Sequence, residues 1–112
     1  MGLTVGFDTS AGEQVAEQLP QSRVVKAFNS VLAPNHNPVA FEAGSVFVPV
    51  AGDDEAAVES VVDFAKSLGF DAVAAGPLKN ARYTEPLAEL LVQLAYGQGA
   101  GTGISVRLQR AN

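Results

Sequence analysis

The chain has 112 residues, of which 47% are hydrophobic and 17% charged, and its 7 basic and 12 acidic residues give a net charge of −5. This composition is typical of one folded domain and excludes a disordered tail. The acidic balance argues against nucleic acid as a partner, because proteins that bind phosphate backbones concentrate Lys and Arg. Cysteine is absent, which excludes disulfides, thiolate metal ligands and a thiol nucleophile.

Neither end of the sequence indicates export or membrane insertion. Residues Met1–Thr4 lack the basic stretch and the long apolar run of a signal peptide. Residues 90–106 carry no charge, but Gln93, Gln98 and four glycines make them too polar for a membrane span. We therefore expect one domain over residues 1–112, located in the cytoplasm and without a membrane partner.

The first third of the chain predicts a helix, a strand and a loop. Ser10–Glu13 has the pattern of a capping box, and the apolar residues that follow at helical spacing predict a helix that Pro20 ends. Val24–Phe28 is a short β-branched run and predicts a strand. Residues 30–44 are rich in Pro and Asn and predict a long loop.

Two further strands flank a second predicted helix. Val46–Ala51 predicts a strand in which Pro49 cannot donate a ladder hydrogen bond, so we expect that strand at a sheet edge or irregular there. Asp53 or Asp54 is the expected N-cap of the helix that follows. Phe70–Ala75 predicts the third strand.

The last third is predicted to be helical. Gly76-Pro77 breaks the chain, and a helical region begins near Leu78. Glu85-Pro86 predicts a fresh helix start, because proline is favoured in a first turn and disrupts a helix interior. Gly97 is expected to end this helix, and Ile104–Leu108 is a candidate for a short terminal element.

Strands that alternate with helices favour an α/β layered sheet. The predicted fold is the rear half of a Rossmann-like sheet, with about three strands and flanking helices, plus a C-terminal helical segment. Within the single domain, residues 1–77 form the α/β part and residues 78–112 the helical part.

Few residues suggest catalysis by side chains. The glycines at 97–103 follow a helix and do not fit G-x-G-x-x-G, so a flexible helix exit is favoured over a phosphate-binding loop. Asp53 could bind a ribose, although a helix cap is favoured. His36 has no spaced metal partner, so a solvated loop residue is favoured over proton transfer. No Ser-His-Asp, paired acid–base or metal pattern is present.

Two groups of polar residues lie near predicted strand ends. Lys26 and Asn29 flank such an end, where open α/β sheets place ligands, and the sequence supports a ligand-facing and a fold-stabilising role equally. Asn80 and Arg82 follow the third strand near a helix start that could attract an anion. The favoured alternative is that Asn80 caps the helix and Arg82 pairs with Glu85.

Four segments in order, Val24–Asn29, Val48–Asp54, Leu68–Asp71 and Ala75–Gly99, resemble the C-terminal half of the NADPH-dependent F420 reductases (F420-dependent NADP oxidoreductases). They are also similar to the cytosolic oxidoreductase domain of the six-transmembrane metalloreductases. The resemblance implies a Rossmann domain followed by a small helical part, and hydride transfer between NADP and coenzyme F420 or a flavin. In such enzymes the cofactors carry the chemistry and the protein positions them.

The same resemblance implies two groups of cofactor-binding residues and no catalytic side chain. Ala27, Phe28 and Asn29 would lie near the nicotinamide. Gly76, Pro77, Leu78, Asn80 and Arg82 would help to line the deazaflavin or substrate side.

The resemblance also implies that the dinucleotide-binding half of the fold, on the order of 90 residues in about three βαβ-type units, would precede Met1. We therefore expect the chain to be inactive alone. An open sheet edge would pair either with a second copy, as a homodimer, or with a separate N-terminal dinucleotide-binding half. The alternative is a non-catalytic α/β binding or dimerisation module, so the sequence leaves open whether the chain is an enzyme.

Overall fold

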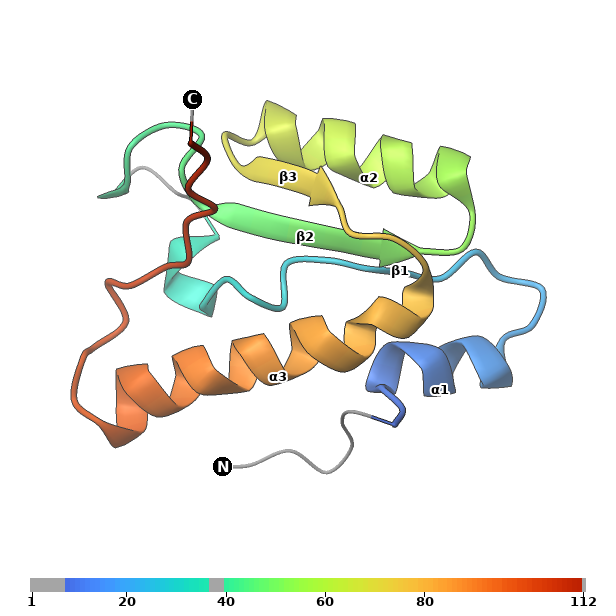
Figure 1. Cartoon of the computed structure of the whole chain (residues 1–112), viewed down its shortest axis with the longest axis horizontal. Coiled ribbons are helices and arrows are strands. Elements are labelled where there is room, and N and C mark those ends of the chain that lie inside the picture. The colour runs from blue at the N-terminus through green and yellow to red at the C-terminus, as the bar shows by residue number, and fades with distance from the viewer. Residues whose placement is uncertain (1–7, 37–39, 112) are drawn as a thin grey trace.

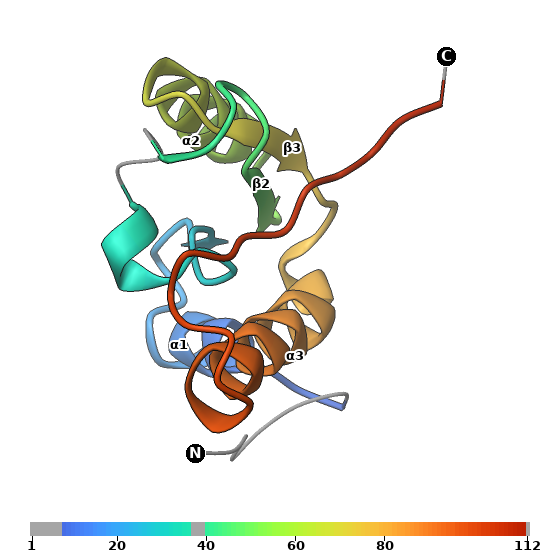
Figure 2. The same ribbon diagram turned by 90° about the vertical axis from the view of Figure 1, so that its left-hand side faces the viewer.

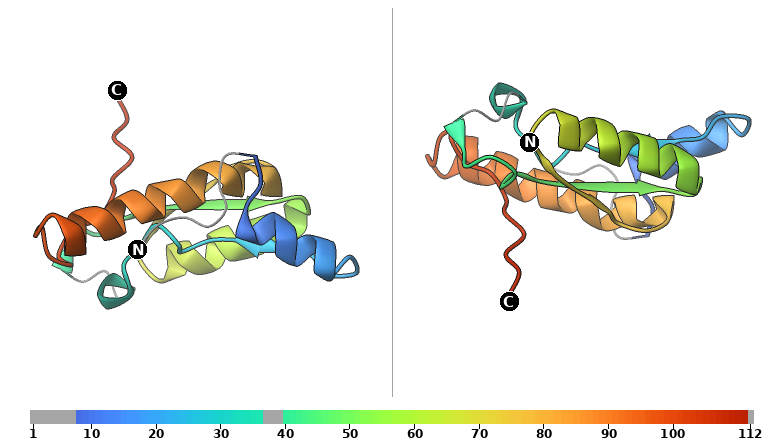
Figure 3. Two further views of the ribbon diagram at one scale, coloured as in Figure 1. Left: turned by 90° about the horizontal axis from the view of Figure 1, so that it is seen from below. Right: turned by 90° about the horizontal axis from the view of Figure 1, so that it is seen from above.

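The computed structural model describes residues 8–36 and 40–111. It confirms an α/β fold, in which a three-stranded sheet has α2 on one face and α3 on the other, with α1 beside α3 (Figures 1 and 3). The main elements in chain order are α1 (Ala11–Gln18), β1 (Val25–Lys26), β2 (Phe47–Gly52), α2 (Glu55–Ser67), β3 (Asp71–Ala74) and α3 (Ala81–Val92). In the described ranges, the 3₁₀ turns η1 (Ala33–Asn35) and η3 (Leu78–Asn80) lie between these elements, and the π-helix η4 (Gln93–Gly97) follows α3.

Two parts of the sequence predictions lie outside the described residues: Met1–Thr4, where no export signal is expected, and residues 37–39 of the predicted loop. The rest of that loop contains η1.

The sheet has the order β1-β2-β3 and is mixed. β2 and β3 are parallel, with Val50 opposite Ala74, and α2 provides the crossover between them. β1 is antiparallel to β2, with Val25 opposite Gly52. The carboxyl ends of β2 and β3 therefore lie at the same end of the sheet, whereas the carboxyl end of β1 lies toward the opposite end.

The prediction that Pro49 marks an edge or irregular strand is wrong, because β2 is the central strand and Pro49 lies opposite Val73 in its regular part. The donors that β2 directs at β3 include the N–H of Gly52, which bonds to the carbonyl of Gly76. Backbone directions alternate along a strand, so the missing donor of Pro49 faces the β1 side. β1 pairs only with Ala51 and Gly52, so no ladder bond is lost.

The strand predicted at Val24–Phe28 is shorter than expected. β1 ends at Lys26, and Phe28 has a φ of 63°, in the left-handed region that bulky residues rarely adopt. The ring of Phe28 packs edge-on against that of Phe70, with centroids 5.5 Å apart. This tertiary contact accompanies a backbone turn that local strand propensity does not favour.

The main core lies between the sheet and α2. Its buried members alternate along the strands and recur along one face of the helix: Val31, Val46, Val48, Val50, Val58, Ala65, Phe70 and Ala72. A smaller cluster joins η1, the end of α3 and the C-terminal segment through Leu32, Leu91 and Ala95. Burial of these side chains in the main core fixes the positions of β2 and β3, and therefore the position of their carboxyl ends.

The segment at Ile104–Leu108, a candidate terminal element, forms no regular structure. Ile104 and Val106 pack against the smaller cluster, and the carbonyl of Val106 accepts a 2.8 Å hydrogen bond from the N–H of Phe47. Beyond this contact the chain runs past β2 and β3 (Figure 2), where Arg107 pairs with Glu42 and Arg110 pairs with Asp71 of β3.

The prediction of a fresh helix start at Glu85-Pro86 is wrong. α3 runs from Ala81 to Val92 with Pro86 inside it, and η4 continues the helix to Gly97, where its end was predicted. Contacts that Thr84 and Glu85 make with other elements hold the helix through the proline. No helix in the described ranges combines the length and apolar character needed to cross a bilayer.

Replacement of Pro86 by Ala should stabilise the fold. The substitution restores an N–H inside α3 and removes a ring clash, worth about 3 kcal/mol in a helix interior. Greater freedom of the unfolded chain offsets about 1 kcal/mol of this gain. We expect urea unfolding to show an increase of about 1–2 kcal/mol, whereas an unchanged or lower value would mean that α3 accommodates the proline without strain.

Candidate functional site

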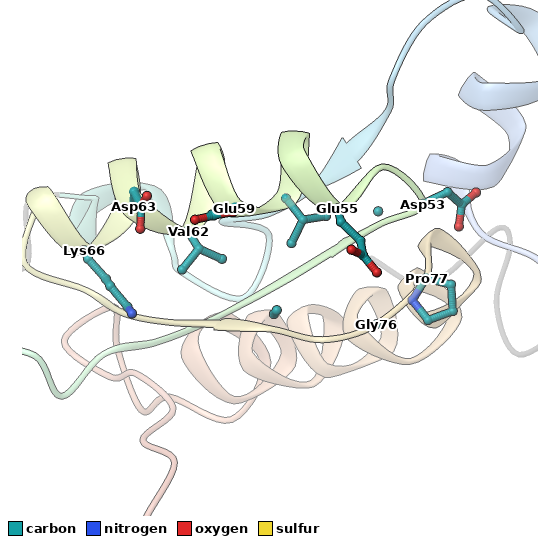
Figure 4. A pocket seen from close by; sticks show the side chains of 11 residues that line it. Asp53, Glu55, Glu59, Val62, Asp63, Lys66, Gly76 and Pro77 are labelled. Atoms are coloured by element: carbon teal, nitrogen blue, oxygen red, sulfur yellow. The ribbon is translucent and has the colours of Figure 1, made fainter.

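Two hollows open where β2 and β3 end. The larger, of about 720 Å³, lies between α2 and β3, and Figure 4 shows Glu55, Val62 and Lys66 directed from α2 toward that strand. The second, of about 510 Å³, lies between α1 and η3. Asp53 and Pro77 line both. The carboxyl ends of parallel strands are where open α/β sheets bind ligands, and both volumes fall within the usual range for small molecules.

Acidic side chains dominate both hollows. The larger one has Lys66 as its only cation, against Asp53, Glu55, Glu59 and Asp63. In the second, Lys79 faces Glu13, Glu17 and Asp53. These surfaces are suited to neutral or cationic groups, and they disfavour a pyrophosphate.

The turn after β3 is held by Asn80. Gly76 has a φ of 91°, and a Cβ added there would lie 2.7 Å from Nδ2 of Asn80. This amide donates a 2.6 Å hydrogen bond to the carbonyl of Ala75. The favoured interpretation of Asn80 as a side-chain helix cap is therefore wrong, because its side chain closes the turn instead. Glycine is needed at position 76 for both its backbone conformation and its lack of a side chain.

Asp53 and Asp54 have different roles. Asp54 is the N-cap of α2 and accepts a 2.9 Å hydrogen bond from the N–H of Ala57. Asp53 accepts one of 3.0 Å from the N–H of Leu78, a buried residue, and so ties the end of β2 to η3. Asp53 therefore does not cap α2, so its favoured interpretation as a helix cap is wrong, and its carboxylate instead holds the chain at Leu78.

Glu85 joins three elements. Its carboxylate accepts hydrogen bonds from the N–H groups of Ala11 (2.8 Å) and Gly12 (3.1 Å), and it lies 3.4 Å from Nζ of Lys26. Glu85 is only 9% exposed. A residue of α3 thus caps the N-terminus of α1, across 74 positions of sequence, and neutralises a lysine of β1.

Arg82 pairs with Glu13 of α1, so the favoured pairing with Glu85 is wrong. Its guanidinium donates two hydrogen bonds of 2.8 and 2.9 Å to the Glu13 carboxylate, which also accepts one from the hydroxyl of Ser10. The Arg82 contact lowers the pKa of Glu13, burial opposes that shift, and Ser10 adds to it. The same contact raises the pKa of Arg82.

The residues implied near the nicotinamide directly follow β1 and are held by contacts within the fold. Nδ2 of Asn29 donates a 2.8 Å hydrogen bond to the carbonyl of Thr84, while Ala27 and Phe28 pack against the main core. Oδ1 of Asn29 and Oγ1 of Thr84 are buried without a partner. This polar contact between sheet and α3 is therefore incompletely satisfied.

The geometry separates the predicted site residues into two groups. Gly76, Pro77, Leu78 and Asn80 lie together beside the hollows at the carboxyl ends of β2 and β3. Ala27, Phe28 and Asn29 follow β1, which is antiparallel to β2, so they lie toward the opposite end of the strands. The prediction that Lys26 and Asn29 lie at a ligand-binding strand end requires β1 to be parallel to β2, whereas the two strands are antiparallel.

Sequence reasoning missed the roles of Glu85 and Thr84. The capping box identified Ser10 and Glu13, but no local pattern shows that a carboxylate 74 positions away completes the same helix end. The only earlier interpretation of Glu85 pairs it with Arg82, its neighbour in the chain.

His36 is exposed, and its Nε2 lies 3.0 Å from the carbonyl of Val31. Within the described part of the chain, no group of acidic and histidine side chains is arranged to hold a metal ion.

A bound dinucleotide would need a free helix N-terminus or a glycine loop for its pyrophosphate. The N-termini of α1 and α2 are occupied by Glu85 and Asp54, and the hollows beside them are acidic. The described residues therefore do not fit the phosphates of NADP.

Substitution of Glu85 by Gln should lower the free energy of unfolding by about 2 kcal/mol, because hydrogen bonds to a charged group are worth about 1.5–3 kcal/mol and Lys26 would lose its counter-ion. The matched control is Glu89→Gln, one turn further along α3, where the carboxylate contacts the exposed Gln93. Urea unfolding of both variants checks this; equal effects would contradict the capping role.

The Glu13–Arg82 pair should make stability depend on pH. The pKa of Glu13 is lower in the folded chain than its ordinary value of 4.5, so its contribution is fully present above about pH 4.5 and is lost as pH falls through the folded pKa. The stability difference between the wild type and Glu13→Gln should therefore shrink on acidification from pH 6 to pH 3. A difference that stays constant over this range would refute the assignment.

Comparison with known proteins finds two informative relatives, although no family model matches the chain. The F420-dependent NADP reductase of Methanocaldococcus jannaschii is 34% identical over 105 aligned residues, which cover 88% of this chain and 45% of that protein. A crystal structure from Arthrobacter sp. FB24, of a protein provisionally named as an F420-dependent NADP reductase, superposes with a TM-score of 0.87 and 29% identity. It covers 97% of this chain and 50% of the other.

The chain thus spans about half the length of the reductases that it matches. The resemblance inferred from four sequence segments is confirmed by sequence and by fold: the chain is related over nearly its whole length to part of the F420-dependent NADP reductases.

Proposed function

We propose that this chain forms the acceptor-side part of an NADP-dependent oxidoreductase, which transfers a hydride between NADP(H) and coenzyme F420 or a flavin. The observation that carries the proposal is the structural match over 97% of the chain, at a TM-score of 0.87, to a protein with that name. The chemistry itself, donation and acceptance of a hydride, is supplied by the cofactors.

The chain's own contribution is positional. The turn at Gly76–Leu78 offers an apolar wall at Pro77, and two hydrogen bonds brace it: Asn80 to the Ala75 carbonyl, and Leu78 to Asp53. A braced backbone at the carboxyl end of a strand can hold a flat ring in one orientation. No side chain is required to gain or lose a proton in this role.

The dinucleotide phosphates must then be held elsewhere. Neither α1 nor α2 has a free N-terminus, and the hollows are acidic. We therefore propose that the chain acts together with a dinucleotide-binding part, corresponding to the length of its relatives that it does not match, and that it is inactive without that part. The cytoplasm, where NADP is available, is the proposed location.

The open outer edge of β3 supports the alternative, a non-catalytic binding or dimerisation module. The N–H groups of Asp71 and Ala75 face β2, so those of Ala72 and Ala74 face away from it. Such unpaired groups form a template for another strand.

Activity after reconstitution tests the proposal. We expect no NADPH-dependent reduction of F420 or flavin by the chain alone, and measurable reduction when the unmatched part of the Methanocaldococcus jannaschii reductase is added. Calorimetric titration of NADPH into the chain alone should give no binding.

Two glycine variants make the test specific. Gly76→Ala should lower the reconstituted activity, since its Cβ would displace Asn80. Gly101→Ala is the control, because Gly101 also has a positive φ but has no atom within 4 Å of an added Cβ. A well-folded mixture that stays inactive would count against the oxidoreductase, and equal losses in the two variants would count against the role of the turn.

A further inference from the structure

The outer edge of β3 is open to another strand. The N–H groups of Asp71 and Ala75 bond to β2, at 2.8 and 2.7 Å, and β2 is the only strand that pairs with β3 in the described ranges. A strand residue directs its N–H and its C=O to the same side, so both groups of Ala72 and Ala74 face away from β2. Residues 71–74 contain neither Lys nor Pro, the residues that commonly protect an exposed edge.

A groove follows this edge beneath α2. It is the larger hollow, of about 720 Å³, and its apolar part is formed by Val58 and Val62 of α2 and by Ala74 of β3. Figure 4 shows Val62 directed toward the strand. A strand added to β3 would lie about 4.8 Å beyond it and direct alternate side chains toward α2. We call this hollow, together with the outer edge of β3, the β3 groove.

Three carboxylates line the β3 groove at a regular spacing. Glu55, Glu59 and Asp63 are exposed and follow one another at intervals of four residues, about 6 Å along a helix. Alternate side chains of an extended strand are about 6.7 Å apart. Because α2 runs alongside β3 (Figure 1), each carboxylate can face one side chain of an added strand. Within the described part of the chain, none of the three has a hydrogen-bond or ion-pair partner.

Charge selects the occupant of the β3 groove. Lys66 is the one cation that lines the hollow, and Figure 4 shows it at the opposite end from Glu55. Side chains that face the three carboxylates must therefore be basic for binding to be favourable. Two copies of the chain, each with a net charge of −5 and an acidic groove, would instead repel one another at this edge.

The order of the sheet separates the β3 groove from the proposed nicotinamide side. β1 and β3 are the outer strands of the described sheet, and Ala27–Asn29, which the resemblance implies near the nicotinamide, follow β1. A dinucleotide-binding part is therefore expected beside β1, which leaves the edge of β3 free. This step rests on the proposed function, whereas the other steps use only the shape and charge of the groove.

We propose that the β3 groove binds an extended basic segment of another protein, which pairs with β3 as an added strand. Its alternate Lys or Arg side chains contact Glu55, Glu59 and Asp63. Backbone hydrogen bonds to Ala72 and Ala74 supply affinity, and the row of carboxylates supplies the preference for alternating basic residues.

Titration with a defined peptide tests the proposal. The probe is a capped seven-residue peptide in which lysine alternates with threonine, and we expect it to bind the chain. The same peptide with glutamate in place of lysine should not bind. The matching peptoid, in which N-substituted glycines carry the same side chains, keeps the charge but has no backbone N–H, and we expect it to bind at least 10-fold more weakly.

Charge reversal in the groove gives a second comparison. Glu59→Lys should weaken binding of the lysine peptide by about 10-fold, because a central ion pair is replaced by repulsion. The matched control is Glu17→Lys, an exposed residue of α1 that lies outside the β3 groove, so both variants have the same net charge. The control should bind like the wild type, and circular dichroism should show both variants folded.

Amide hydrogen exchange identifies the edge that is paired. The N–H groups of Ala72 and Ala74 should exchange more slowly when the lysine peptide is bound. The N–H groups of Asp71 and Ala75 already bond to β2, so their exchange should change little. Neither readout involves NADPH or hydride transfer, so a negative result here leaves the proposed function unaffected.

Four outcomes would overturn the proposal. They are a peptoid that binds as tightly as the peptide, equal losses in Glu59→Lys and Glu17→Lys, unchanged exchange at Ala72 and Ala74 with peptide bound, and exclusion of the peptide by the unmatched part of the Methanocaldococcus jannaschii reductase. The last result would assign the edge of β3 to that part of the enzyme.

Discussion

The arrangement of α1, β1 and α3 depends on one buried carboxylate. Glu85 binds two backbone N–H groups at the start of α1 and the ammonium of Lys26, so a single side chain fixes three elements at once. α1 buries only Gly12, while Val15 and the C-cap residue Leu19 are 44% and 52% exposed. Apolar packing therefore contributes little to its attachment, and the charged contacts of Glu85 and Arg82 provide most of it.

The same use of side chains recurs along the sheet edge where β2 and β3 end. Asp53 accepts from Leu78, Asp54 caps α2, and Asn80 closes the turn at Gly76. The contacts of Asp53 and Asp54 occupy backbone N–H groups that could otherwise bind an anion. This end of the sheet is therefore braced but poorly suited to phosphates, which agrees with the proposal that the dinucleotide is held by a part of the protein that the chain does not match.

The sequence predicted those features of the fold that depend on neighbouring residues in the chain. The α/β class, the ends of α1 and η4, and the helix between two strands follow from capping residues and apolar spacing. Pro49 and Pro86 misled because each proline is tolerated for a reason outside its own segment: β1 is too short to need a donor at Pro49, and tertiary contacts hold α3 through Pro86. The partners of Arg82 and Glu85 could not be read either, since 69 and 74 positions separate them from their contacts in α1. The direction in which β1 pairs with β2 could not be predicted either, because a two-residue strand carries no sequence pattern that distinguishes parallel from antiparallel pairing. This direction separates the predicted site residues into two groups.

The left-handed backbone of Phe28 places local preference and tertiary packing in conflict. Residues 24–28 favour an extended strand, and a bulky residue at a positive φ costs about 1–3 kcal/mol. The strand stops at Lys26 only while Phe28 is packed on Phe70. In a partly folded chain this frustrated segment would relax to a longer strand. Its outer edge would then be a larger template for unwanted β pairing, so the segment is protected from such pairing only once Phe28 has packed on Phe70.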